Sequence, residues 1–407
     1  MTKHLIRDLM YLYQAVFLAE MRNLVTQAFF DDHYPDKKET LVAFALFFST
    51  LFTMFGIMAS TKLMRKNMES EMTKTSKFLM TFGVVLAISV SFTALFCVKN
   101  YLVYIIIFSI FSFFLNFIYN IFDVFISGNV SQEEKEKNVR ILVAYQMSGY
   151  IVGPLLYSFF SKQIVLFIGV SIVLLFICFF PASREYILMS INKVNKLSEK
   201  MKTAVSVHAA DEATQKADKI ALMYSFMMFC ATNSLTPSIA YLMKDYLMVE
   251  NFTTKSSYFL AGTVLVSVIV IVMIPAVNQW KIRVLAPVSF ILAIIFIMTI
   301  RSSSAPALAL YAALCGFGNG VFLSGSRYYV SSAGAERGLV AKYNKIMTIG
   351  TLFGFTVTAV ISWFCIRNHT DVIPVKLLTI MFMFGFAVVF SFLQKSDSRA
   401  KATNNAA

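Results

Sequence analysis

The sequence is dominated by long apolar runs of roughly 20 residues, the length that an α-helix needs to cross about 30 Å of hydrocarbon. Of the 407 residues, 58% are hydrophobic and 14% are charged, a composition that excludes an ordinary soluble globular protein. Backbone groups in lipid must be paired within their own segment, and the runs lack the alternation typical of a membrane β-barrel. We therefore predict an all-α membrane protein with twelve transmembrane helices, numbered here as spans 1 to 12. They cover residues 7–29, 40–61, 78–97, 101–127, 139–161, 164–181, 219–242, 256–277, 282–300, 305–329, 339–366 and 373–394.

Basic residues gather on the connections at one side of the predicted membrane. They include Lys62, Arg65 and Lys66 after span 2, and Lys135 and Arg140 before span 5. By the positive-inside rule, both termini lie in the cytoplasm. This topology and anionic lipid account for the net charge of +14, and the loops lack the stacking aromatic residues of a nucleic-acid groove. We expect a multi-pass protein of a bacterial inner membrane, with no cleaved signal peptide and no nucleic-acid partner.

The spans fall into two groups of six, which predicts two pseudo-symmetric six-helix bundles. The expected divisions are an N-terminal bundle at 1–182, a cytoplasmic linker at 183–218, a C-terminal bundle at 219–394 and a disordered cytoplasmic tail at 395–407. The start of the linker has apolar residues on one helical face. It is either an amphipathic helix on the inner membrane surface or a simple basic tether.

A glycine pattern repeats between the two groups of spans. A shift of 201 residues places Gly149 over Gly350 and Gly153 over Gly354. Parallel six-helix halves form a transporter architecture whose binding site lies near the membrane midplane. Small residues at this spacing let a neighbouring helix pack closely, and Pro154 frees the carbonyl of the fourth residue before it, which bends span 5.

The Gly149-xxx-Gly153-Pro154 stretch resembles a signature carried by antiporters and exporters of the major facilitator superfamily. A second signature of that superfamily, in the loop after span 2, corresponds to GIMASTKLMRK from Gly56. Gly56 and Arg65 fit this pattern. Ser60 stands where the superfamily has an acid, and Leu63 replaces its second glycine, so a gating salt bridge at this loop is in doubt.

The resemblance covers essentially the whole chain and implies a divergent superfamily member. The most similar subgroups are drug:proton and sugar-efflux exporters, and siderophore exporters of the same superfamily are a further alternative. The implied partners are a small-molecule substrate, protons and the lipid bilayer, and the implied functional form is a monomer.

Charged residues inside the spans are the first candidates for function, because charge in lipid is costly. Tyr13, Glu20 and Gln27 recur at a spacing of seven and predict a polar stripe along span 1. A carboxylate partly removed from water can bind and release a proton near neutral pH. We predict proton coupling by Glu20 and by Asp123 of span 4. For Glu20, a structural ion pair or a position near the outer surface stays open.

Further polar residues in the spans are predicted to bind substrate. Helix packing is the alternative for Tyr145, Gln146 and Asn319. The basic residues Arg22 and Lys345 suggest an anionic or zwitterionic cargo, and neutralisation of Glu20 or Asp123 is their alternative role. These residues are Arg22, Asn116, Asn120, Tyr145, Gln146, Asn233, Asn319 and Lys345. Exporters of this kind often have a basic residue on span 4, which is missing here. Arg327 and Lys345 are predicted replacements, and snorkelling to the inner surface is the alternative for Arg327.

Enzymatic activity, a metal site and a cofactor are not expected. The histidines fall outside the spans and far apart, and the cysteines lack the spacing of a metal site. No phosphate-binding Walker loop occurs, so direct use of ATP is not expected. The histidines are His4, His33, His208 and His369.

These observations predict a secondary active transporter that exports a small organic molecule by alternating access, as a proton antiporter. A proton-coupled importer of a small polar or anionic solute is the first alternative, because fold does not set direction. A membrane receptor or scaffold that transports nothing is the second.

Overall fold

The computed structural model describes part of the chain in detail. The described residues are 38–69, 74–128, 212–248, 252–334, 339–368 and 370–404, together with residues 26, 29, 30, 32–34, 140, 141, 143, 144, 147, 169, 172 and 173. All regular elements in these ranges are helices. The all-helical prediction is therefore confirmed over the described residues.

The chain divides into two compact units, which we call unit 1 and unit 2. Unit 1 comprises Met1–Asn129 and Tyr145–Ala209, and unit 2 comprises Val130–Ala144 and Ala210–Ala407. The later boundary falls inside the segment that the sequence predicts as a linker. The assignment of residues 130–144 to unit 2 was not predicted.

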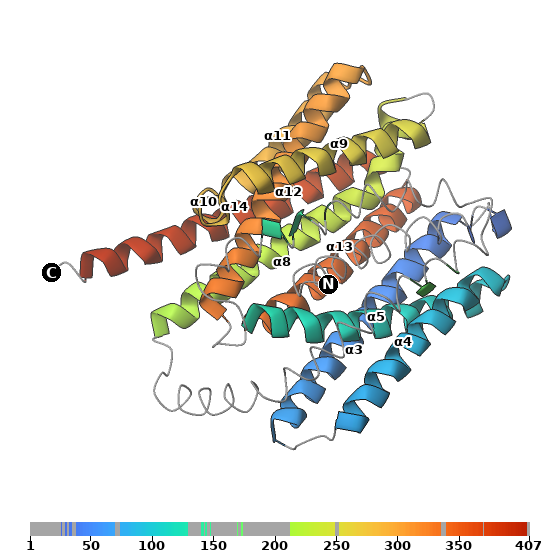
Figure 1. Ribbon diagram of the computed structural model, residues 1–407. Coiled ribbons are helices and arrows are strands. Elements are labelled where there is room, and N and C mark those ends of the chain that lie inside the picture. Colours follow the sequence, from blue (N-terminus) through green and yellow to red (C-terminus); the bar gives the residue numbers. More distant parts are fainter. Residues whose placement is uncertain are drawn as a thin grey trace. The chain divides into compact units, whose positions relative to one another are not determined.

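Unit 1 contains α3 (Lys38–Glu69), α4 (Lys74–Cys97) and α5 (Tyr101–Gly128) (Figure 1). A side-chain cap starts α5, because Asn100 Oδ1 accepts hydrogen bonds from the backbone N–H groups of Leu102 at 2.9 Å and Val103 at 3.3 Å. Such a cap satisfies amides that have no partner within the first turn of a helix. Spans 2, 3 and 4 of the prediction coincide with these three helices.

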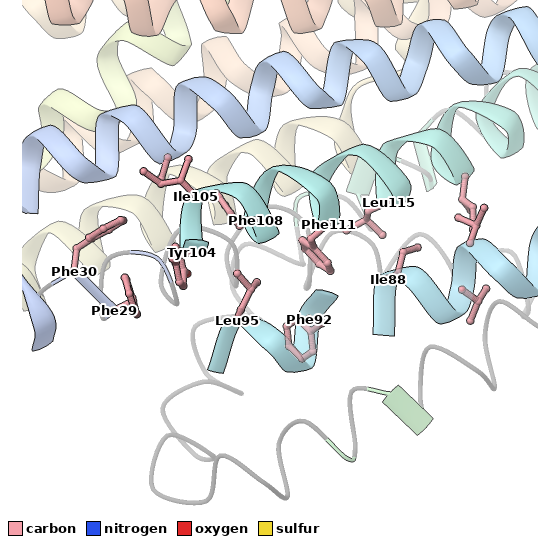
Figure 2. Packing of buried hydrophobic residues seen from close by; sticks show 14 residues of the cluster. Phe29, Phe30, Ile88, Phe92, Leu95, Tyr104, Ile105, Phe108, Phe111 and Leu115 are labelled. Carbon is pink, nitrogen blue, oxygen red and sulfur yellow. The ribbon is translucent and has the colours of Figure 1, made fainter. Parts of the chain in front are cut away.

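Aromatic side chains form much of the core of unit 1 (Figure 2). The ring of Phe29 stacks on the ring of Tyr104 with their centroids 3.9 Å apart, and the Tyr104 hydroxyl lies 3.2 Å from Thr26 Oγ1. The rings of Phe92 on α4 and Phe111 on α5 lie 5.8 Å apart. This packing joins α4, α5 and the residues around Phe29.

Unit 2 contains the remaining labelled helices of Figure 1 and one π-helical turn. They are α8 (Glu212–Tyr241), the π-helical turn η3 (Leu242–Tyr246), α9 (Phe252–Met273), α10 (Ala276–Lys281), α11 (Leu285–Ile300), α12 (Ala305–Gly334), α13 (Leu339–Arg367) and α14 (Val372–Asn404). Within this unit, α8 packs against α13 and α14, and α12 packs against α9, α10 and α11. Predicted spans 7 to 12 each coincide with one of the longer helices.

Two helices of unit 2 extend beyond the predicted spans. Helix α8 begins at Glu212, so its first two turns fall within the segment 183–218 that the sequence predicts as a linker. Helix α14 continues to Asn404, so residues 395–404 are helical although the sequence predicts a disordered tail. Residues 212–218 and 395–404 contain few apolar side chains. A prediction based on apolar runs therefore starts α8 too late and ends α14 too early.

Five helices among the described residues are long and apolar enough to cross a membrane. They include Tyr101–Ile118 in unit 1 and Ala305–Ser332 in unit 2. Many large apolar side chains on these helices are exposed, for example Phe382 and Phe386 of α14, as lipid-facing residues would be. These features fit an integral membrane protein. The total of twelve spans in two six-helix bundles stays a prediction, because spans 1, 5 and 6 fall largely outside the described residues.

Candidate functional site

Several predicted site residues lie outside the described residues, and their roles stay predictions. These are Glu20, Arg22, Tyr145, Gln146, Gly149, Gly153 and Pro154. Asp123 lies on α5 and Arg65 on α3, but their side chains are not among those described.

The two asparagines predicted on span 4 face α3. Asn120 is fully buried, and its Nδ2 donates to Ser60 Oγ at 2.8 Å and Thr61 Oγ1 at 3.1 Å. Asn116 is partly exposed, and its Nδ2 donates to Thr53 Oγ1 at 3.0 Å. Asn120 therefore joins two helices, and Asn116 retains some surface with which it could contact a ligand.

Gly56 explains why α3 and α5 can pack so closely. A β-carbon at this position would collide with the backbone carbonyl of Phe113 on α5. Ser60, which stands in place of the superfamily's acid, is fully buried one turn further along α3 and donates to the carbonyl of Ile57 at 2.9 Å. The altered signature thus belongs to a helix contact, in which a charge would be costly.

The second-half glycine pair lies between α13 and α8. A β-carbon at Gly354 would collide with the carbonyl of Cys230, and Ser234 Oγ lies 2.8 Å from that carbonyl and 3.0 Å from the carbonyl of Gly354. Asn233, predicted to bind substrate, is partly exposed and donates from Nδ2 to the carbonyl of Phe229 at 2.8 Å. Gly354 therefore allows α13 to pack closely against α8.

The glycines around Asn319 contact two different helices. Gly316 and Gly320 face the backbone of α9, and Gly318 faces the backbone of α11. Ser267 Oγ of α9 also lies 3.0 Å from the carbonyl of Gly316. Asn319 itself is partly exposed on α12, between these contacts. The structure thus supports close helix contact as the role of the glycines.

The predicted basic residues of unit 2 have opposite surroundings. Lys345 of α13 is exposed, and Arg327 of α12 is only 8% exposed. The snorkelling alternative for Arg327 predicts a side chain that extends to the membrane surface. The burial of Arg327 does not favour that alternative.

The sequence reasoning missed Lys376, one turn into α14. This lysine is 8% exposed and lines a small pocket between α8 and α14. The pocket is otherwise lined by Ser238 and the apolar side chains of Leu235, Leu242, Ile373 and Leu377. A charged residue inside the last apolar run was the signal that could have identified it.

A stacked polar and aromatic cluster was also missed. Tyr329 donates from its hydroxyl to Asp218 Oδ1 at 2.9 Å, and its ring stacks on Trp280 with centroids 4.5 Å apart. The guanidinium carbon of Arg283 lies over the Trp280 ring, 4.7 Å from its centroid. The same guanidinium donates a hydrogen bond to the carbonyl of Ser391 at 3.2 Å. The cluster joins α8, α10, α12 and α14, and we call it the Trp280 cluster.

Comparison with solved structures gives full-length matches. The human organic anion transporter MFSD10 (TETRAN) matches with a TM-score of 0.68 and 13% identity, over 97% of this chain and 100% of that one. A bacterial homologue of the iron transporter ferroportin, in an outward-facing state with soaked iron, matches with a TM-score of 0.69 and 13% identity, over 97% and 100%. The E. coli fucose:proton symporter FucP matches with a TM-score of 0.58 and 12% identity, over 96% and 98%. FucP is a major facilitator superfamily transporter.

This chain has the major facilitator fold. The resemblance seen in the sequence is thereby confirmed at the level of fold. No protein-family model and no curated protein matches the chain, in keeping with a divergent sequence on this fold.

The major facilitator fold gives the packing residues a context. Transporters of this architecture bind substrate near the membrane midplane, between two halves. Asn120 and Gly56 make helix contacts inside unit 1, and Gly354 makes one inside unit 2. Asn116, Asn233 and Asn319 keep partial exposure and remain substrate-binding predictions. Within the described ranges, no three His, Cys, Asp or Glu side chains come together as a metal site would require.

Proposed function

We propose that this chain is a secondary active transporter that exports a small organic molecule by alternating access, as a proton antiporter. The observation that carries the proposal is the match to transporters along almost the whole chain, with TM-scores up to 0.69. Apolar helices of membrane-spanning length support the same proposal. A bacterial inner membrane and a functional monomer are parts of this proposal.

An anionic cargo is the substrate class that the described residues favour. Lys376 and Arg327 are both enclosed within unit 2, although only 14% of all residues are charged. Cations enclosed in membrane helices often serve a substrate or an ion pathway. One protein of similar fold is described as an organic anion transporter. Drug-like molecules, sugars and siderophores are the cargo types to compare.

Proton coupling rests on Glu20 and Asp123, the acidic residues predicted within spans 1 and 4. An importer of a small polar or anionic solute is the second candidate. It is favoured by the similarity to FucP, which is a proton symporter.

Transport in sealed vesicles tests the proposal. The purified chain is reconstituted, a pH gradient is imposed, and the movement of labelled organic anions, sugars and siderophores is followed. Protons moving down their gradient should drive the cargo in the opposite direction. This transport should slow strongly in Glu20→Gln, with Glu20→Asp as the matched control. Movement that ignores the gradient removes the antiport mechanism. Failure of every tested solute to move favours a receptor or scaffold.

A further inference from the structure

The turn between α10 and α11 carries a buried positive charge. Arg283 is 9% exposed, and its guanidinium lies over the Trp280 ring. Its Nη1 donates to the carbonyl of Trp280 at 2.9 Å, and its Nη2 donates to the carbonyl of Ser391 on α14 at 3.2 Å. The Tyr224 hydroxyl of α8 donates to the carbonyl of Arg283 at 3.0 Å and so fixes the turn. All of these groups belong to unit 2.

This charge has no acidic partner among the residues that the structure describes. The groups around it are two carbonyls, the indole ring of Trp280 and the phenols of Tyr224 and Tyr329, which are uncharged at neutral pH. The acid of the Trp280 cluster, Asp218, accepts from Tyr329. Carbonyl dipoles and an aromatic face offset part of the cost of burying a cation. An anion would offset more of that cost, because buried charges are most stable when they are paired.

One edge of the guanidinium also has an unused donor. Arg283 Nε is buried and has no hydrogen-bond partner in the described part of the chain, and the same is true of Ser391 Oγ, whose side chain is 3% exposed. In the planar guanidinium, the Nε–H and one Nη2–H point the same way from one edge. Since Nη2 donates to the carbonyl of Ser391, the Nε–H points toward α14 beside that residue. Two buried donors from different helices therefore face the same place.

We propose that Arg283 Nε and Ser391 Oγ bind a small inorganic anion of the size of chloride. A monatomic anion accepts from both donors at once and supplies the negative charge that the guanidinium lacks. A water molecule also accepts hydrogen bonds, but it is neutral and leaves the charge without a counter-ion. The burial of both side chains favours a small anion over a bulky one.

The site is close enough to the surface for such an anion to enter. Trp280 is partly exposed, and the next residue, Lys281, is exposed at the end of α10. A lysine at this point attracts anions from solution. The bound anion is a ligand of the Trp280 cluster and is separate from the cargo proposed above, so it is tested without any transport.

Tryptophan fluorescence gives a local test, because the chain has only two tryptophans and Trp280 lies against Arg283. Trp363→Phe removes the other one, which is exposed on α13. Bromide, a heavy-atom quencher, is titrated into the purified full chain carrying this change, with gluconate keeping the ionic strength constant. Quenching of Trp280 should include a part that saturates with bromide and that chloride reverses. Quenching that only rises linearly and that chloride does not reverse overturns the proposal.

Ser391→Ala, made in the same Trp363→Phe protein, tests the second donor. The Ser391 hydroxyl makes no hydrogen bond within the described ranges, so its removal should leave the fold intact. The bromide concentration at half-saturation should rise about tenfold, the effect of losing one hydrogen bond to a charged group. Ser289→Ala is the matched control, because this buried hydroxyl donates to the carbonyl of Leu285 in its own helix at 2.8 Å. An unchanged half-saturation in Ser391→Ala overturns the proposal.

Thermal unfolding provides a second measurement that does not depend on fluorescence. A ligand that binds only the folded protein raises the unfolding temperature, so chloride should raise it relative to gluconate at equal ionic strength. The difference should be smaller in Ser391→Ala and in Arg283→Lys, which keeps the charge and removes the Nε–H. Equal unfolding temperatures in chloride and gluconate overturn the proposal. A loss of stability in Ser391→Ala that is the same in both salts also overturns it, since this would indicate a direct bond between Nε and Oγ.

Discussion

The hydroxyl of Tyr329 on α12 donates a 2.9 Å hydrogen bond to Oδ1 of Asp218 near the start of α8, 111 residues earlier in the chain. The Tyr329 ring also stacks on Trp280 of the short helix α10. One side chain therefore connects three helices of unit 2, by a polar contact at its tip and an aromatic contact on its face.

Substitutions at Tyr329 should separate these two contacts. Tyr329→Phe keeps the ring and removes one hydrogen bond to a charged group, so we expect a loss of about 1.5–3 kcal/mol in the free energy of unfolding. Tyr329→Ala removes the stacking as well and should be more destabilising. Thermal unfolding of the purified protein measures both. Equal stability of Tyr329→Phe and the unchanged protein would contradict a stabilising role for the bond to Asp218.

Replacing glycines with alanine should distinguish close contacts from open positions. Gly56→Ala places a methyl group against the carbonyl of Phe113, and overpacking of this kind costs about 1–3 kcal/mol. Gly385→Ala is the matched control, because a β-carbon there meets nothing within 4 Å. It should raise stability by roughly 0.5–1 kcal/mol, since alanine favours a helix over glycine. The unfolding temperatures of the two variants should thus move in opposite directions.

Asn120 and Asn116 should respond differently to alanine although they lie one turn apart. Asn120→Ala removes hydrogen bonds to Ser60 and Thr61 in a fully buried position, so the unfolding temperature should fall. Asn116 is partly exposed, and Asn116→Ala should change KM for the cargo with a smaller effect on stability. Unfolding and transport measured on the same preparations check both outcomes. A stable Asn120→Ala protein with altered KM would reverse the assignment.

Lys376 provides a test of cargo charge. Lys376→Met keeps the length of the side chain and removes its charge, and we expect kcat/KM for an anionic cargo to fall about tenfold, as for one lost charge-assisted contact. Transport of a neutral sugar should change little. The matched control is Lys342→Ala, which removes an exposed charge on α13 at a position with no predicted role in binding. An equal loss for anionic and neutral cargo would assign Lys376 to structure instead of substrate charge.

Hydropathy alone predicted most of the described helices. Runs long enough to span lipid identify α3, α5 and α12 with little ambiguity, because a charged or polar turn separates each from its neighbours. The end of α14 was mispredicted because charged residues from Lys395 onward can continue a helix after the membrane ends. Helix formation needs backbone pairing, and it does not require apolar side chains.

The site was harder to predict than the helices. Sequence spacing places Asn116 and Asn120 on one face of α5, but it cannot tell which helix that face meets. The partner of Asn120 is about 60 positions earlier, at Ser60. Similarly, nothing near Arg283 in the sequence indicates Ser391, because their contact depends on the tertiary fold.

The π-helical turn at Leu242–Tyr246 follows α8 directly, and the amide of Leu247 donates to the carbonyl of Leu242 at 2.9 Å. A turn of this kind accommodates one residue more than an α-helix would over the same length. Such bulges let a chain absorb an inserted residue while the helix before them keeps its contacts, here those of α8 with α13 and α14. When homologous sequences are aligned with this one, we therefore expect single-residue gaps in span 7 to concentrate between Leu242 and Tyr246, leaving the register of α8 unbroken.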